Sequence, residues 1–302
     1  MAYRIDPSPA GDGTRLIRYE REATIVLVGC GGTGGFLAEA VCRLLIGRPA
    51  RLFLVDPDRV EPHNVARQAF DRRDVGRFKA QVLAERLARR FGREVGYSVL
   101  PYDRELHTQV FGNADSRLNL LLGCVDNAAA RRAIAATLDD RPWRYGYAQP
   151  AMHVLWWLDC GNGRNSGQVL LGNVTRPEGL RGAFLPTAGV CRALPVPSLQ
   201  RPDLLEAPPE PRPTPDCAEA VASGDQGPTI NQAVAAFAAC YVEKLLAGSC
   251  CWMASYFDLD DGTLRCVPAD AKTVAALAGL HPNAVAPPTH RAEPTSHPAG
   301  EG

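Results

Sequence analysis

Residues 25–35 have the sequence IVLVGCGGTGG, in which a short apolar run leads directly into a cluster of glycines. The run 25–28 is β-branched and apolar, which predicts a strand buried on both faces of a parallel sheet. The glycines permit a tight turn in which backbone N–H groups approach an anion closely. A predicted helix over Phe36–Ile46 directs its N-terminus at the same place. The segment therefore predicts a nucleotide-binding strand–turn–helix unit, and a glycine-rich turn without a ligand is the alternative.

The glycine spacing does not say which nucleotide is bound. From Gly29 onward it follows Gly-x-Gly-x-x-Gly, a pattern that fits NAD, FAD and ATP alike. A second predicted strand, Arg51–Val55, ends at Asp56, which lies roughly twenty residues beyond the glycines, where a dinucleotide fold places its ribose-binding carboxylate. Aspartates before a proline are also common in turns, and Pro57 follows here. The position relative to the glycines favours the ribose role.

The composition excludes several classes of protein. The chain has 302 residues, enough to bury a substantial α/β core, and its 33 Lys and Arg balance 33 Asp and Glu, so nucleic acid is not an expected partner. No apolar run approaches the roughly 18 residues that a membrane span needs. The polar start, residues 1–19, lacks the apolar region of a signal peptide. Ten cysteines without a regular framework indicate free thiols in a reducing compartment, which predicts a cytoplasmic protein.

Another carboxylate is predicted at the same edge of the sheet as Asp56. Tyr97–Leu100 is a candidate third strand, and the apolar run Leu118–Leu122 predicts a fourth, followed by Asp126 and a helix over 128–138. In open α/β sheets, ligands bind at the carboxyl ends of the strands. Asp126 therefore points to the crevice beside Asp56. Asn127 reads equally well as a binding residue and as the N-cap of the helix.

The second half departs from a simple repeat of strand and helix. The runs 152–158 and 168–174 predict a hairpin that extends the parallel sheet with antiparallel strands. Residues 175–216 are proline-rich without a period, and such a long connection is usually functional or disordered. A helix from Pro228 to about Leu246 and a last hairpin, 252–259 with 263–267, complete the pattern.

Five separated motifs together identify a family. They are Gly29-x-Gly31-Gly32-x-Gly34, Asp56-x-Asp58, Asn64-x-x-Arg67-Gln68, Gly76-x-x-Lys79 and Asp126-Asn127. In this order and spacing they resemble the ThiF/MoeB/HesA family, the relatives of ubiquitin-activating E1 enzymes. The resemblance implies a Rossmann-like adenylation fold whose parallel sheet is extended by antiparallel strands, with a proline-rich crossover loop and a long helix after it. It also implies an adenylyltransferase that activates the C-terminal glycine of a small ubiquitin-like protein with ATP and Mg²⁺.

The resemblance implies a role for particular residues. Asp56 would bind the ATP ribose, Asn64, Arg67 and Lys79 would bind phosphates, and Asp126 would hold Mg²⁺. The remaining members of the motifs are candidate nucleotide-binding residues: Gly29, Gly31, Gly32, Gly34, Asp58, Gln68 and Asn127. Because little covalent chemistry falls to the protein in adenylation, Arg67, Lys79 and Asp126 are the candidate catalytic residues, acting through charge and position.

A cysteine is the candidate nucleophile for a second step. Cys217 matches the crossover-loop cysteine of conjugating and sulfur-transferring relatives and would take the activated acyl group as a thioester. Asp216 beside it raises a thiol pKa, so an inert loop thiol is the alternative, and Cys191 is the fallback nucleophile. Many relatives hold zinc with two Cys-x-x-Cys pairs. No such pair occurs here, which makes zinc an unlikely cofactor.

The likeness also predicts the domain organisation and the partners. It covers about residues 22–268 and is nearest to the bacterial PRTRC-system ThiF branch, on features such as Asp159-x-Gly161-Asn162 and Thr229-Ile230-Asn231-Gln232. We expect an extension over 1–22, an adenylation domain over 23–281 with a crossover loop over 175–227, and a disordered tail over 282–302. A ubiquitin-like protein ending in glycine, an E2-like protein and a second copy of the chain are the expected partners. The long helix is a candidate dimer contact, and an arginine of the extension would reach the partner's ATP site, the candidates being Arg15, Arg18 and Arg21.

Two other functions remain open from the sequence. An NAD-dependent oxidoreductase would share the glycines and Asp56, but it leaves Lys79, Asp126 and the motif around Arg67 unexplained. A non-catalytic E1-like scaffold would keep the fold without the activity. The presence of all the adenylation residues counts against such decay.

Overall fold

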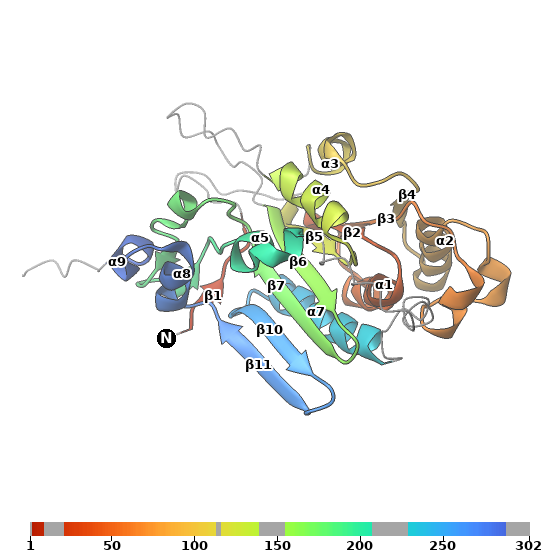
Figure 1. Cartoon of the computed structure of the whole chain (residues 1–302). Helices are drawn as coiled ribbons and strands as arrows, with labels where there is room; N and C mark the ends of the chain where they lie inside the picture. The colour runs from red at the N-terminus through yellow and green to blue at the C-terminus, as the bar shows by residue number, and fades with distance from the viewer. Residues whose placement is uncertain (1, 9–20, 113–115, 139–154, 207–228, 288–302) are drawn as a thin grey trace, which may run out of the picture.

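The computed structural model describes residues 2–8, 21–112, 116–138, 155–206 and 229–287. Their centre is an eight-stranded sheet in the order β11-β10-β7-β6-β5-β2-β3-β4 (Figure 1). The strands are β2 (Arg21–Val28), β3 (Ala50–Val55), β4 (Gly96–Ser98), β5 (Ser116–Gly123), β6 (Leu155–Asn162), β7 (Ser166–Gly172), β10 (Trp252–Asp258) and β11 (Thr263–Pro268). The neighbouring strands β6, β5, β2, β3 and β4 pair in parallel, and β7, β10 and β11 continue the sheet in antiparallel pairs. The predicted α/β fold class is confirmed.

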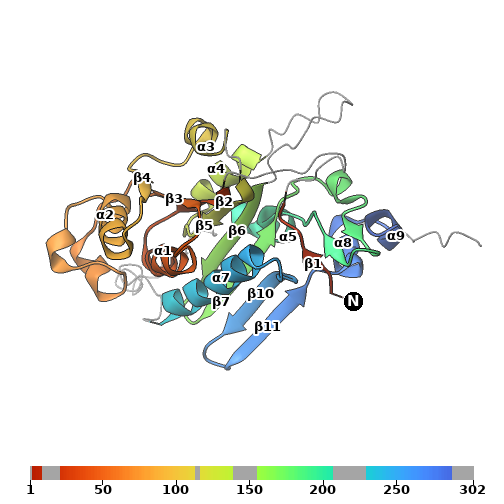
Figure 2. The same ribbon diagram turned by 180° about the vertical axis from the view of Figure 1, so that it is seen from behind.

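Helices cover both faces of the parallel half (Figures 1 and 2). One layer contains α1 (Gly32–Leu44), α2 (Lys79–Phe91) and α7 (Ile230–Leu246), and the other contains α3 (Arg104–Phe111) and α4 (Ala128–Leu138). Alternate residues of β2 enter the two cores: Ile25 and Leu27 pack toward the first layer, and Val26 and Val28 toward the second. This burial on both faces is why residues 25–28 form a continuous apolar run.

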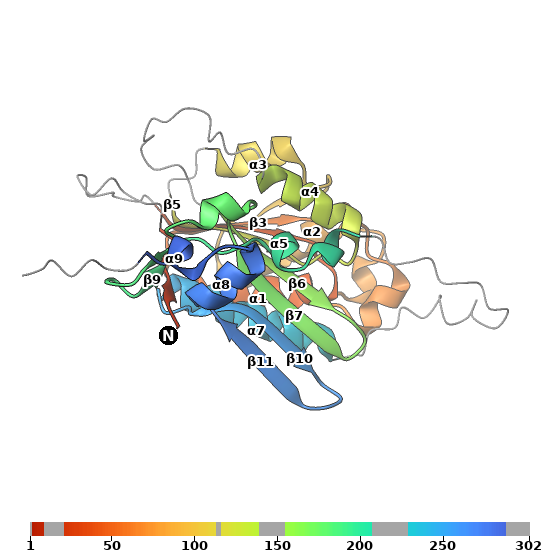
Figure 3. The same ribbon diagram turned by 60° about the vertical axis from the view of Figure 1, so that its left-hand side comes forward.

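Helix α7 lies between α1 and the antiparallel part of the sheet, as Figure 3 shows from the side. Its residues Ile230, Val234, Tyr241 and Leu245 are fully buried, and Phe237 stacks on Phe257 of β10 at a ring-centroid distance of 5.0 Å. The predicted long helix is therefore present, with nine of its 17 residues buried within the chain. The dimer contact suggested for this helix stays a prediction.

A second, small sheet contains residues that the sequence analysis left without structure. In it, β1 (Arg4–Ile5) pairs with β9 (Val190–Cys191), which pairs with β8 (Phe184–Leu185). Ile5 is fully buried, so the first residues belong to the packed fold and are not only an extension. Two-residue strands are too short to show a hydrophobic period, which is why the sequence did not reveal them. The other residues of the predicted extension, 9–20, lie outside the described residues, and so do Arg15 and Arg18.

The proline-rich connection is also packed over its described part. It contains η3 (Pro177–Leu180), α5 (Pro197–Gln200) and η4 (Pro202–Leu205). Leu180, Phe184 and Leu194 are fully buried, so residues 175–206 are not the loose connection expected from composition. Single apolar side chains between tight turns fill the core without making a periodic pattern.

The C-terminal part adds two further helices, α8 (Ala271–Ala278) and α9 (Pro282–Val285). Asp270 caps α8 by accepting hydrogen bonds from the backbone N–H groups of Lys272 and Thr273, both at 3.0 Å. Val285 is fully buried, so the tail predicted as disordered over 282–302 begins with an ordered turn, and residues 288–302 lie outside the described residues. None of the helices in the described ranges is both long and apolar enough to span a bilayer.

Candidate active site

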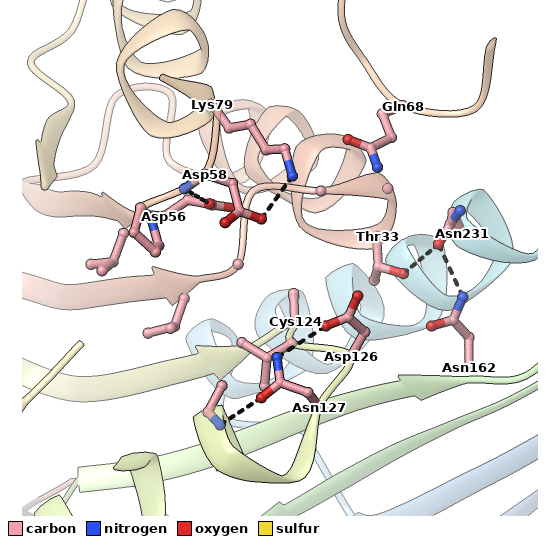
Figure 4. Close-up of a pocket in the computed structure, with 18 of the residues that line it drawn as sticks. Thr33, Asp56, Asp58, Gln68, Lys79, Cys124, Asp126, Asn127, Asn162 and Asn231 are labelled. Atoms are coloured by element: carbon pink, nitrogen blue, oxygen red, sulfur yellow. Dashed lines mark hydrogen bonds and ion pairs between the residues drawn. The ribbon is translucent and has the colours of Figure 1, made fainter. Parts of the chain in front are cut away.

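A cavity of about 690 Å³ lies at the carboxyl ends of β2, β3 and β5, where the sequence placed the nucleotide (Figure 4). Its lining includes predicted site residues from every motif: Gly29, Gly31, Gly32, Asp56, Asp58, Arg67, Gln68, Lys79, Asp126 and Asn127. Apolar groups such as Pro101, Val125 and Ala133 complete the wall. A volume in this range suits a cofactor-sized ligand.

Two glycines of the turn, Gly29 and Gly34, have no room for a side chain. Gly29 has φ +92°, and a Cβ there would lie 2.4 Å from the carbonyl oxygen of Cys124. Gly34 has no unusual φ, but its Cβ would lie 1.8 Å from the carbonyl oxygen of Gly29. Helix α1 begins at Gly32, four residues before the predicted start. The first turn of α1, at Gly34, therefore packs directly on the backbone of Gly29.

Asp56 holds the glycine turn in place. Its side chain is 5 % exposed, and Oδ2 accepts a hydrogen bond of 2.6 Å from the backbone N–H of Cys30. Oδ1 accepts a second bond of 2.8 Å from the backbone N–H of Asp58, which is the turn geometry expected of an aspartate before proline. Burial raises the pKa of Asp56, and these two hydrogen bonds and Lys79 act against that shift. Asp56 therefore combines the turn role with a place in the pocket wall.

Lys79 brings a largely buried positive charge to the pocket. It is the first residue of α2, its side chain is 11 % exposed, and its Nζ lies 3.0 Å from Oδ2 of Asp58. Asp58 is mostly exposed, so the pair is open to solvent on the carboxylate side. A buried ammonium needs an anionic partner, and an entering phosphate could share or replace Asp58 in that role.

Asp126 and Asn127 follow β5 at the opposite wall. Asn127 accepts a hydrogen bond of 2.8 Å at Oδ1 from the backbone N–H of Ala130, so it is the N-cap of α4 as well as a pocket residue. Its Nδ2 donates to Oδ1 of Asp126 at 3.2 Å. Among the described residues no group of three or more metal-ligating side chains is found. Mg²⁺ commonly binds through one or two carboxylates together with substrate phosphates and water, and the exposed carboxylate of Asp126 fits that mode.

The segment after β3 places two of its three predicted residues in the pocket. Arg67 and Gln68 line it, and Oε1 of Gln68 is buried without a hydrogen-bond partner in the described structure. Asn64 is different: it is 3 % exposed, lies outside the pocket lining, and accepts a hydrogen bond of 2.9 Å at Oδ1 from the backbone N–H of Glu61. It caps the short helix η1 (Pro62–Ala66), which carries Arg67 at its end. The structure thus gives Asn64 a role in shaping the turn and no contact with the pocket.

Asn231, Asn162 and Thr33 form a polar cluster that the motif analysis gave no role. Oδ1 of Asn231 accepts hydrogen bonds from Oγ1 of Thr33 at 3.1 Å and from Nδ2 of Asn162 at 3.0 Å (Figure 4). All three residues line the pocket. Asn162 and Asn231 stand in the two segments that carry the narrower family likeness, which was the only signal available in the sequence.

The N-termini of three helices face the pocket. Gly32 begins α1, Asn127 caps α4, and Asn231 lies in the first turn of α7, and each of these residues lines the cavity. Free backbone N–H groups and the helix dipoles give such termini a partial positive charge that attracts phosphate. With Arg67 and Lys79, they make the pocket suited to a highly charged anion.

A buried ion pair links α4 and β6, two elements that also carry pocket residues. Nε of Arg131, on α4, lies 3.2 and 3.3 Å from the two carboxylate oxygens of Asp159, on β6. Asp159 is fully buried, and burial raises its pKa to about 6, although Arg131 acts in the opposite direction.

The two candidate nucleophiles lie away from this pocket or outside the described structure. Cys217 is outside the described residues. Cys191 is fully buried in β9 of the small sheet, and its Sγ donates to the carbonyl oxygen of Ala193 at 3.2 Å. Burial raises its pKa to about 12, so Cys191 is not an accessible thiolate and its fallback role is withdrawn.

Comparison with known proteins identifies the family. Residues 13–250 match the family model described as the ThiF family. The chain belongs to the ThiF family. The fold and the broader family resemblance inferred from the five motifs are therefore confirmed, while the narrower likeness to the PRTRC branch stays a prediction.

Curated relatives match only part of the chain. Ubiquitin-like modifier-activating enzyme 5 of Branchiostoma floridae is 34% identical over 137 residues, which cover 41% of this chain and 32% of that protein. The ATP-dependent ubiquitin transferase-like protein Cap2 of Escherichia coli is 42% identical over 67 residues, which cover 22% of this chain and 11% of that protein. The matched part is thus less than a third of the length of each of these two relatives.

Solved structures share the fold at low sequence identity. E. coli MccB with MccA-N7isoASN superimposes with a TM-score of 0.53 at 17% identity, covering 82% of this chain and 64% of that chain. PaaA gives a TM-score of 0.53 at 15% identity, covering 82% and 72%. At these identities the likeness concerns the architecture only.

Proposed function

We propose that this protein is an activating enzyme that uses ATP to adenylate the C-terminal glycine of a small ubiquitin-like protein. The observation that carries the proposal is the convergence in one cavity of the glycine turn, three helix N-termini, Arg67 and Lys79, with the carboxylate of Asp126 at the facing wall. Membership of the ThiF family supports it, as do relatives named as ubiquitin-like modifier-activating enzyme and ATP-dependent ubiquitin transferase-like protein.

In this proposal, apolar side chains of the pocket bind the base of ATP and polar or charged groups bind its ribose and phosphates. The apolar groups around Pro101 and Val125 suit the base, and Asp56 offers its remaining carboxylate lone pairs to the ribose. Arg67 and Lys79 bind the phosphates, supported by the first turns of α1 and α7. Asp126 would hold Mg²⁺, which supplies charge neutralisation on the phosphates when it is bound.

Adenylation requires the protein to position the two reactants and to stabilise the negative charge that develops. A carboxylate oxygen of the substrate glycine attacks the α-phosphorus of ATP, the bond from that phosphorus to the bridging oxygen breaks, and pyrophosphate leaves with the electron pair. The charge that grows on pyrophosphate is stabilised by Lys79 and Arg67, whose positions are set by α2 and η1 before the substrate arrives. The buried position of Lys79 increases this effect, because nearby charges interact more strongly away from water.

The proposal extends to a thioester on Cys217 and transfer to an E2-like protein. The acyl carbon of the adenylate would be attacked by the Cys217 thiolate, with AMP leaving. Cys217 is the remaining cysteine candidate once the burial of Cys191 is taken into account. A homodimer also stays a prediction, and sedimentation velocity of the full chain would test it.

The test is exchange of labelled pyrophosphate into ATP in the presence of ubiquitin-like proteins that end in glycine. The enzyme should catalyse exchange only with such a partner, and a non-reducing gel should show an adduct that disappears in Cys217→Ala. Exchange without an adduct would retain adenylation and reject the thioester. ATP binding without exchange for any candidate would favour a non-catalytic scaffold, and thermal stabilisation by NAD but not by ATP with Mg²⁺ would favour an oxidoreductase.

A further inference from the structure

Asn231 connects three segments that are distant in the sequence. It lies in the first turn of α7, is 2 % exposed, and receives hydrogen bonds from Thr33 in the first turn of α1 and from Asn162 at the end of β6. Both bonds go to the same atom, Oδ1, and Thr33 is itself only 6 % exposed. The amide of Asn231 is therefore a fixed joint between the glycine turn, the β6–β7 hairpin and α7 (Figure 4).

Gly32 is shaped to receive that amide. A Cβ at Gly32 would lie 2.4 Å from both Cγ and Nδ2 of Asn231 and 2.7 Å from its Oδ1. Gly32 has no positive φ that would by itself require glycine. The reason for a glycine at this position is consequently the side chain of Asn231, which occupies the space beside the turn.

We propose that Asn231 is a positioning residue for the nucleotide pocket. It keeps the first turn of α1, and with it the N–H groups of the glycine turn, at the distance from α7 that the phosphates need. This rests on the proposed function for its purpose, although the contacts themselves do not. Because Oδ1 already accepts two protein hydrogen bonds, the residue acts through Thr33 and the turn and not through a bond from Oδ1 to the ligand.

Three variants separate this role from simple packing. Asn231→Ala removes both hydrogen bonds and empties the space beside Gly32. Asn231→Asp keeps an acceptor for both donors but places a negative charge among the phosphate-binding groups. Gln232→Ala, at the next residue of the same helix turn, changes an exposed side chain that does not line the pocket and is the matched control.

The first measurement is amide hydrogen exchange of residues 29–36 in the nucleotide-free protein. We expect Asn231→Ala to raise exchange there about tenfold while the central strand β5 keeps its protection, and Asn231→Asp and Gln232→Ala to leave it unchanged. The second is the affinity for ATP and for adenosine. Asn231→Ala should lower the affinity for ATP about tenfold. Asn231→Asp should lower the affinity for ATP by a larger factor than the affinity for adenosine, because adenosine has no phosphate to repel.

A double-mutant cycle of Asn231→Ala with Thr33→Val completes the test. If Asn231 acts through Thr33, the two changes together should lower the affinity for ATP by little more than either change alone. Unchanged exchange in residues 29–36 for Asn231→Ala, or a rise spread equally over the whole chain, would overturn the proposal. Should the parent protein bind no ATP, the proposed function fails, while hydrogen exchange still decides whether Asn231 positions the turn.

Discussion

The pocket end of the parallel sheet and the small sheet around β9 are both densely packed, yet they bury different kinds of residue. At the pocket end the buried groups include Asp56, Lys79 and Asn231, each held by hydrogen bonds or an ion pair. In the small sheet the buried side chains include Ile5 and Phe184. Burying a polar group costs free energy unless the group is paired, and each of these three pocket residues has such a partner. The difference distinguishes the proposed binding end of the molecule from a region whose buried side chains are apolar.

Phe184→Ala should produce the largest effect, and it should be on stability alone. The side chain is fully buried and packs edge-to-face on Tyr3 with ring centroids 4.9 Å apart. Removing it should lower the free energy of unfolding by about 4 kcal/mol, as for other buried phenylalanines. The affinity of the remaining folded protein for ATP should not change. Denaturant unfolding together with an ATP titration checks both, and a fall in ATP affinity would contradict the division between the two regions.

Asp159→Asn should reveal the buried charge at the pocket end as a dependence of stability on pH. Because the native pKa of about 6 lies above the usual value of 3.8, the native state holds a proton between these pH values that the unfolded chain has lost. Its contribution is therefore fully present below about pH 4 and is lost as the pH rises through 6, by at most about 3 kcal/mol. The free energy of unfolding of the parent, relative to that of Asp159→Asn, should accordingly be higher at pH 4 than at pH 7. A difference independent of pH would mean that Arg131 keeps the carboxylate ionised throughout.

Gly34→Ala should lower the affinity for ATP about hundredfold, or roughly 2.7 kcal/mol of binding free energy, because the new Cβ would force the glycine turn open. Gly182→Ala is the matched control near the small sheet: its φ is +68°, but no atom lies within 4 Å of its Cβ position. That change should cost only about 1 kcal/mol of stability and leave ATP binding alone. Equal effects of the two substitutions on ATP affinity, measured by calorimetry, would argue against a phosphate-binding turn.

Lys79→Ala and Arg67→Ala should each slow pyrophosphate exchange at least about tenfold, or 1.4 kcal/mol of barrier. Lys272→Ala removes an equal charge from an exposed position on α8 and should leave the rate unchanged. Exchange at the parental rate in either pocket variant would remove that residue from the proposed mechanism.

Much of the pocket could be predicted because its elements are long or carry fixed motifs. Helix α4 has the residue range that the sequence predicts, and β3 and β5 differ from it by a residue or two, since each of these strands is a short apolar run. The glycines, Asp56 and Asp126 share one crevice, as predicted from the way parallel strands bring their carboxyl ends to one edge, whereas the place of Lys79 came only from the family resemblance. Asn64 caps η1 outside the pocket lining, which a motif could not reveal because it gives a position in the chain and not the direction of a side chain, and its phosphate role stays a prediction.

The sequence by itself determined the family, the order of the five motifs along the chain and the charged residues available to the pocket. Only the tertiary structure decided that Asn231 meets Thr33 across 198 positions, that Gly32 is small to admit an amide, and that Cys191 is sealed inside a sheet. The physical reason is range. Periodicity and turn chemistry act between near neighbours, whereas hydrogen bonds between distant segments and the burial of single side chains depend on how the completed layers pack.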